Sequence, residues 1–175
     1  MEINDTNLKL LILDIIEELK RLRGLWKDEF RDVPPVLWFG DIHNNPQVLV
    51  ISANPSRPDK PNSNPRIPYC KKWNIDQPDV EELMKDYNNY FVNNPSKKWF
   101  GGDMSHTQGR IEDFLNGLGA SFFGRDNYIQ ALHIDLLPFS TECTFTAIDS
   151  QIPRKQVIVQ KPLCMIPLGL SNHTF

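Results

Sequence analysis

The segment Val48–Ser52 (VLVIS) constrains the fold most, because four consecutive apolar residues there put apolar side chains on both faces of an extended chain. That pattern is typical of a strand at the centre of a parallel sheet covered by helices. A second apolar strand is predicted from about Tyr128 to Leu137, where Pro138 ends it. We therefore expect a mostly parallel central sheet.

Helices are predicted on either side of these strands. Residues 6–23 carry apolar side chains at steps of three and four, which places them on one helix face: Leu8, Leu11, Ile12, Ile15, Ile16, Leu19 and Leu22. Asp5 or Thr6 can cap this helix and Gly24 can end it. Further helices are predicted over 79–92, opened by Asp76 and Pro78, and after the capping box of Ser105–Gln108, where Ile111, Phe114, Leu115 and Leu118 form the apolar side.

A short extended piece at Val36–Phe39, a helix over 142–150 and a third strand at Val157–Gln160 complete the expected elements. Together they predict a three-layer α/β/α sandwich in one domain spanning residues 1–175. Residues 151–175 show little pattern.

Composition narrows the class of protein. The chain has 175 residues, a net charge of −3 and no apolar run near the roughly 20 residues that a membrane helix needs. The N-terminus lacks the pattern of a signal peptide, so we expect a cytoplasmic protein without membrane contact. The three cysteines lie far apart without a C-x-x-C motif, which argues against a structural zinc or an iron–sulfur cluster.

A proline-rich loop follows the first strand. Its five prolines between residues 54 and 75 exclude a helix or a central strand, and long loops of this kind are often functional. Cations outnumber acids in it: Arg57, Lys60, Arg66, Lys71 and Lys72 stand against Asp59 alone. It is either a solvated loop or one that faces an anion.

Polar residues follow both predicted strands at the point where each ends. Ligands bind beyond the carboxyl ends of strands in open α/β sheets. If the strands are parallel neighbours, Asn54 and Asp135 face one crevice. The alternative for Asn54 is a plain turn.

These two strand ends resemble motifs of the uracil-DNA glycosylase superfamily. The sequence SANPS, with Asn54 and Pro55, is similar to the family's Gly-Ile-Asn-Pro-Gly form, and ALHID, ending in Asp135, is similar to its base-reading strand. The resemblance covers about residues 45–145. It implies a glycosylase-like fold and hydrolysis of the N-glycosidic bond of uracil or a related base in DNA, by a monomer, without a metal or other cofactor.

The resemblance also implies roles for individual residues. Asn54 would hold the attacking water, Pro55 would rigidify its loop, and Asp135 would meet the edge of a base flipped out of the DNA. The remaining implied contacts are Ser56 and His133 with the substrate, Tyr69, Trp73 or Phe100 stacking on the base, and Lys71 and Lys72 on phosphates.

The chain departs from the family at two places. Asp135 stands where the family has Asn, and an ionised Asp accepts hydrogen bonds but donates none. The family's late His-Pro-Ser motif has no counterpart, because His173 in SNHTF lacks the proline. A non-catalytic nucleic-acid or nucleotide-binding domain of the same fold is therefore one alternative.

A metal-dependent hydrolase is the other alternative. On a strand, residues i and i+2 share a face, so Asp41 with His43 and His133 with Asp135 could each present an imidazole beside a carboxylate. Asp103 and His106 are further possible ligands.

Overall fold

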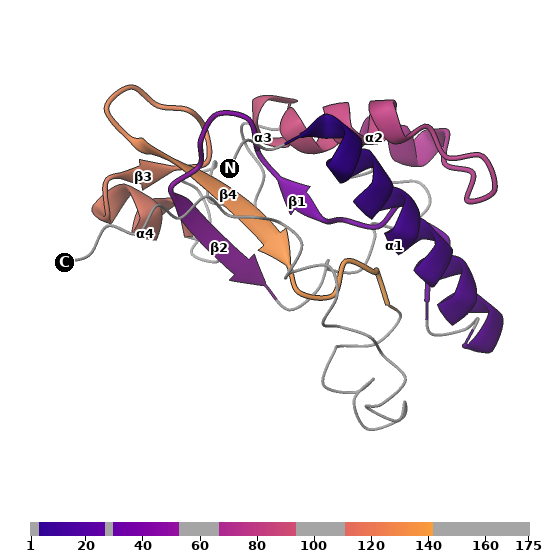
Figure 1. Cartoon of the computed structure of the whole chain (residues 1–175). Coiled ribbons are helices and arrows are strands. Elements are labelled where there is room, and N and C mark those ends of the chain that lie inside the picture. The colour runs from indigo at the N-terminus through magenta and orange to yellow at the C-terminus, as the bar shows by residue number, and fades with distance from the viewer. Residues whose placement is uncertain (1–3, 27–29, 53–66, 94–110, 142–175) are drawn as a thin grey trace.

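The computed structural model describes residues 4–26, 30–52, 67–93 and 111–141 (Figure 1). The elements in these ranges are the helices α1 (Asp5–Leu25), α2 (Val80–Asn88), α3 (Tyr90–Asn93) and α4 (Ile111–Gly117), the 3-10 helix η1 (Pro68–Lys71), and the strands β1 (Trp38–Phe39), β2 (Val48–Ser52), β3 (Ala120–Ser121) and β4 (Ile129–Asp135). The expected mixture of helices and strands is confirmed. The elements predicted over 142–150 and 157–160, and the capping box at 105–108, lie outside the described residues.

The sheet is built around β4. It lies between β1 and β2, and β3 pairs with its first residues. β2 and β3 run parallel to β4, whereas β1 runs antiparallel, with Trp38 opposite Ile134. The expectation of a mostly parallel sheet is therefore corrected to a small mixed sheet. The antiparallel strand is β1, Trp38–Phe39.

Burial shows which strand is central. Ala131 to Asp135 of β4 are all buried, whereas β2 is only partly buried and the side chain of Ile51 is 52% exposed. Among the described strands, β4 and not β2 occupies the centre of the sheet, which corrects the prediction for β2. Both strands are apolar, but they differ in the number of neighbouring strands. Among the described residues, β4 pairs with β1 on one edge and β2 on the other, whereas β2 pairs with β4 alone.

Helix α1 follows its predicted pattern. All seven predicted apolar side chains are buried, and Figure 1 shows the helix on the β1 side of the sheet, near α2. Its ends differ from the prediction. Asn4, rather than Asp5 or Thr6, caps the first turn by accepting from the Thr6 amide at 2.8 Å, and the helix continues through Gly24 to Leu25.

The structure has two helices where one was predicted over 79–92. Asn89 ends α2 and separates it from α3. The cap of α2 is Asp79, whose side chain accepts from the Glu82 amide at 3.0 Å; Asp76 is not its cap. Tyr87 of α2 is fully buried, and its ring meets Trp38 and Phe39 edge-on. These contacts join α2 to β1.

Helix α4 turns a different face inward from the one predicted. Leu115 is buried as expected, but Phe114 and Leu118 are 68% and 59% exposed. Glu112 is buried instead, and it accepts hydrogen bonds from Ser121 Oγ at 2.6 Å and from the Phe122 amide at 3.0 Å. The buried donors of Ser121 and Phe122 require an acceptor, and Glu112 supplies it. This explains why the buried face of α4 differs from the one that the apolar pattern predicted.

Gly40 follows β1 at a position that excludes a side chain. Its φ is +111°, and an added Cβ would lie 3.3 Å from the Leu132 side chain of β4.

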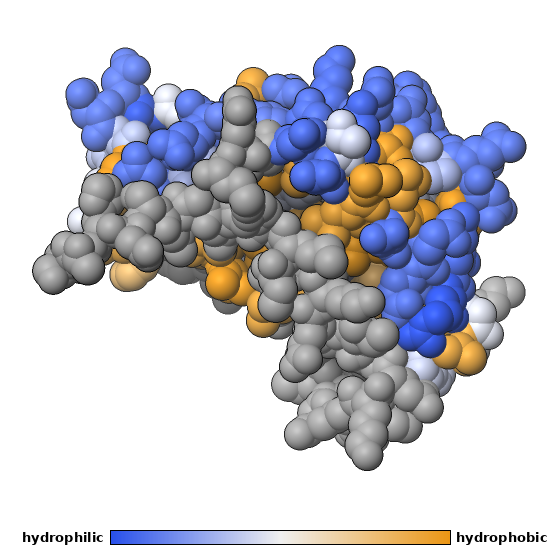
Figure 2. All heavy atoms as spheres, viewed as in Figure 1, coloured by the Kyte–Doolittle hydropathy of each residue, from blue (hydrophilic) through white to orange (hydrophobic). Residues whose placement is uncertain are grey.

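Hydrophilic side chains cover much of the visible surface of α1 and α2 in Figure 2, and hydrophobic ones show between α1 and the sheet. No helix in the described ranges has the length and apolar character that a membrane crossing requires.

Candidate functional site

The ends of β2 and β4 lie side by side. The two strands are parallel and in register from Val48 opposite Ala131 to Ser52 opposite Asp135. Beyond the register, the Leu136 amide donates to the Ser52 carbonyl at 2.9 Å. The condition for a shared crevice, that these strands are parallel neighbours, is therefore met at their carboxyl ends.

Three polar side chains meet at this place: Ser52, His133 and Asp135. His133 Nε2 lies 2.9 Å from Ser52 Oγ and 3.9 Å from Asp135 Oδ1. Residues 133 and 135 share one face of β4, which brings the imidazole and the carboxylate together as predicted from their spacing. His133 and Asp135 are both buried, whereas Ser52 is partly exposed.

Aromatic rings fix the orientation of the imidazole. The ring of Phe39 lies 5.9 Å from that of His133, with 16° between their planes. Tyr90 of α3 stacks on Phe39 at 3.6 Å. Tyr87 meets Phe39 edge-on, so the imidazole rests against an aromatic cluster anchored by two helices.

The geometry limits what this site can do. In a serine-nucleophile triad, the serine and the acid bond opposite nitrogens of the histidine. Here Ser52 and Asp135 both approach Nε2, so the arrangement differs from that of an activated serine. What it offers is a carboxylate acceptor next to an imidazole that can donate or accept, in a setting of low dielectric that strengthens both interactions.

Several predicted site residues cannot be placed. Asn54, Pro55, Ser56 and Phe100 lie outside the described residues, as do Asp103 and His106. Among the described residues, the structure brings together two pairs of the expected substrate contacts: His133 lies beside Asp135, and the rings of Tyr69 and Trp73 meet edge-on at 6.0 Å.

Four of the predicted base-stacking and phosphate-binding residues lie on η1 or directly after it: Tyr69, Lys71, Lys72 and Trp73. Tyr69 is buried, its hydroxyl accepts from the Asp79 amide, and its own amide donates to Asp86 at 2.7 Å. Because Tyr69 is only 2% exposed, it presents little of its ring to a base in this structure. Trp73 is partly exposed and donates to Asp32 at 2.9 Å.

Lys71 and Lys72 are both exposed, and Lys72 has acidic neighbours. Lys72 Nζ lies 2.7 Å from Glu82 Oε1. This hydrogen bond, together with the charges of Glu82, Asp79 and Asp86, raises the pKa of the Lys72 ammonium. A phosphate would have to compete with Glu82 for Lys72.

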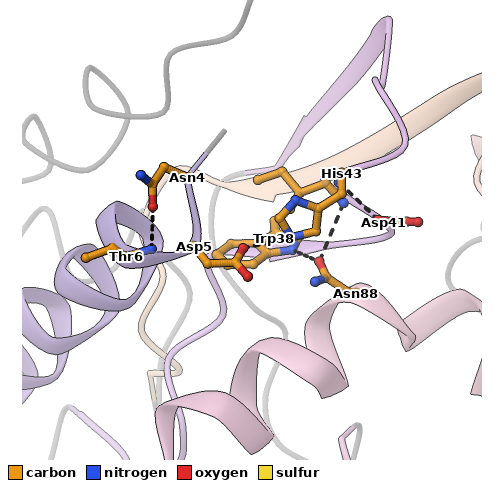
Figure 3. Close-up of polar contacts among 8 residues, drawn as sticks. Asn4, Asp5, Thr6, Trp38, Asp41, His43 and Asn88 are labelled. Atoms are coloured by element: carbon orange, nitrogen blue, oxygen red, sulfur yellow. Dashed lines mark hydrogen bonds and ion pairs between the residues drawn. The ribbon is translucent and has the colours of Figure 1, made fainter. Parts of the chain in front are cut away.

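The second predicted imidazole–carboxylate pair has a different geometry. Asp41 and His43 lie in a turn after β1 instead of on a strand, and Asp41 Oδ1 accepts from the backbone amide of His43 at 3.0 Å. The imidazole of His43 faces Asp5 of α1 at 3.1 Å, beside Trp38 and Asn88 (Figure 3). Trp38 Nε1 donates to Asn88 Oδ1 at 2.9 Å, which joins β1 to α2.

The described residues do not form a metal-binding cluster at these positions. Within the ranges that the structure covers, no three His, Cys, Asp or Glu side chains lie close enough together to hold a metal ion. His133 and Asp135 alone would supply two ligands.

Sequence reasoning missed three members of the site: Ser52, Phe39 and Tyr90. The signal for Ser52 was a polar residue at the end of an otherwise apolar strand, in the position that a parallel register sets opposite Asp135. Phe39 and Tyr90 gave no signal, because an aromatic residue in a connector or helix does not reveal which ring it will contact.

Comparison with protein-family models, with curated proteins and with solved structures finds no match to this chain.

Proposed function

We propose that this chain is a DNA glycosylase that hydrolyses the N-glycosidic bond of uracil or a related damaged base. The observation that supports this proposal is the parallel register of β2 and β4, with Ser52 opposite Asp135. In the sequence, Asn54 follows Ser52, the last residue of β2, by two residues. A water-positioning amide and a base-reading group are needed together for this reaction.

In this proposal each residue has a separate role. Asn54 orients the attacking water, and because a carboxamide is not a strong base, the water attacks a sugar that has already developed positive charge. Asp135 accepts a hydrogen bond from a ring nitrogen of the base. Pro55, Ser56 and Phe100 complete the substrate contacts, and no metal or other cofactor takes part.

The DNA partner is single- or double-stranded and contains the damaged base. Extruding that base from a duplex costs a few kcal/mol, which stacking and edge contacts must offset. Trp73, partly exposed after η1, is a stacking candidate, and the exposed Lys71 is a phosphate contact. We propose that the protein acts as a cytoplasmic monomer.

The finer fold belongs to the same proposal. A three-layer α/β/α sandwich of the glycosylase type needs a parallel strand pair joined by a helical crossover. The parallel pair of β2 and β4, with α2, α3 and α4 between them in the sequence, supports it.

The first experiment incubates the protein with a single-stranded oligonucleotide that contains one uracil, followed by hot alkali. We expect strand cleavage at the uracil position, because alkali breaks the abasic site that base release leaves. Asn54→Ala is the matched control and should lose cleavage by about 100-fold or more if the amide orients the water.

Other outcomes separate the alternatives. Binding to the oligonucleotide without cleavage would replace the glycosylase with a non-catalytic nucleic-acid-binding domain. Cleavage abolished by a chelator and restored by a divalent metal would favour a metal-dependent hydrolase that uses His133 and Asp135. Cleavage that is indifferent to the chelator and lost in Asn54→Ala supports the proposal.

A further inference from the structure

The outer edge of β2 has no partner strand among the described residues. β4 pairs with one edge of β2, and the sheet order β1-β4-β2 leaves the other edge at the margin of the sheet (Figure 1). The Ser52 carbonyl accepts from the Leu136 amide, so it points toward β4. Because successive strand residues direct their backbone groups to alternate edges, Val50 also faces β4. The amides of Leu49 and Ile51 therefore face the outer edge.

This edge lacks the features that keep an exposed strand edge from pairing. Natural edge strands carry charged residues, proline or a bulge, or are covered by another part of the chain. The sequence of β2, VLVIS, contains neither a charge nor a proline, and its register with β4 advances residue for residue. Ile51 is 52% exposed. We therefore expect another strand to cover this edge.

The sequence outside the described residues offers a segment suited to this position. Prolines interrupt residues 53–66 and 161–175, and residues 94–110 contain no two adjacent β-branched residues. Residues 142–150 are predicted to form a helix. Val157–Gln160 begins with Val-Ile-Val, three consecutive β-branched residues of the kind that favour strands.

The connection from β4 is long enough for this segment to run parallel to β2. A parallel strand needs a connection of roughly a dozen residues or more, usually with a helix in it. Residues 142–156, which include the predicted helix, separate Thr141 from the segment. β4 is already paired with β1 and β2, and β1 has only two residues with which a further strand could pair. The five-residue edge of β2 is the better match.

We propose that Val157–Gln160 pairs with the outer edge of β2 as a parallel strand and covers Ile51. The sheet order becomes β1-β4-β2 followed by this strand. The amides of Leu49 and Ile51 then gain acceptors from the same chain. This pairing concerns the sheet and does not depend on the proposed glycosylase activity, so neither proposal fails with the other.

Residue-resolved amide hydrogen exchange of the full chain tests the pairing. In the wild type we expect the amides of Leu49 and Ile51 to be protected, as are those of Val50 and Ser52, which face β4. Ile158→Pro removes an amide and breaks the predicted strand, so exchange at Leu49 and Ile51 should speed up by about 10-fold or more, and much less at Val50 and Ser52. Ile158→Val keeps a β-branched side chain, and this matched control should behave as the wild type.

Three outcomes overturn the proposal. Amides of Leu49 and Ile51 that exchange in the wild type as fast as in an unfolded chain would show an uncovered edge. Protection that persists in Ile158→Pro would assign the edge to another segment. Protection that grows with protein concentration would assign it to a second copy of the chain.

A cross-linking experiment replaces Ile158→Pro if that variant also loses protection at Val50 and Ser52. In a chain whose natural cysteines are replaced by serine, Leu49→Cys or Ile51→Cys is combined with a cysteine placed in turn at each of residues 157–160. A parallel strand predicts that Leu49→Cys forms its disulfide nearer the start of this segment than Ile51→Cys does. The reverse order, or no disulfide within one chain, overturns the proposal.

Discussion

We expect Tyr87→Phe to change the pH dependence of folding stability in a way that an ordinary core substitution does not. Tyr87 is fully buried, and its hydroxyl donates to the carbonyl of Pro35. Its ring also supports Phe39, on which His133 rests. At neutral pH the substitution removes one buried hydrogen bond, so the free energy of unfolding should fall by about 1 kcal/mol.

The alkaline range gives the second half of the prediction. Burial, followed by the nearby charges of Cys70 and Asp86, raises the pKa of Tyr87 well above 10.0. In the unfolded chain the phenol ionises near pH 10, so the wild type loses stability as the pH rises past that value. The loss from this group is about 0.4 kcal/mol at pH 10 and about 1.4 kcal/mol at pH 11. The wild type and Tyr87→Phe should therefore become equally stable between pH 10 and pH 11.

Urea unfolding followed by tryptophan fluorescence from pH 7 to pH 11 measures this difference. Groups common to both proteins cancel in it, and Tyr128→Phe, the same substitution at a 39% exposed position, is measured alongside as the matched control. A gap between wild type and Tyr87→Phe that stays constant from pH 8 to pH 11 would refute the reasoning. It would mean that the phenol ionises equally well in the folded and unfolded states.

Substitutions at two further positions test other parts of the structure. Glu112→Ala removes a buried carboxylate that accepts from Ser121 and Phe122, so we expect a loss of about 3 kcal/mol in urea unfolding, with a smaller loss for Glu112→Gln; a loss below about 1 kcal/mol would contradict this. Asp135→Asn adds a donor where the proposed base edge is read, so it should release uracil faster than the wild type in the alkali-cleavage assay. Equal or slower release would speak against that contact.

The sequence was most informative where local pattern and tertiary position agree. β2 occupies the predicted residues, and the seven apolar residues of α1 all face the core. The mixed sheet could not be predicted, because an apolar run shows that a strand is buried but not which strands flank it or in which direction they run. With only two residues, Trp38–Phe39 gives no sequence pattern from which the direction of the strand could be predicted.

The candidate site was predictable only in part. The spacing of His133 and Asp135 on one face follows from strand geometry, and the contact with Ser52 follows from a register that only the folded sheet defines. Helix α4 shows the opposite case. Its apolar periodicity predicted an inward face with Phe114 and Leu118, but hydrogen bonds from Ser121 and Phe122 require Glu112 inside.

The position of β4 in the chain has a consequence for synthesis on the ribosome. Every strand pairing in the described residues involves β4, which is also the last of these strands to be made. α1 and α2 can form from local contacts, but β1, β2 and β3 have no partner among them until residues 129–135 emerge. Unpaired strand edges recruit other chains, so a nascent chain that stops before Ile129 should be a preferred client of chaperones.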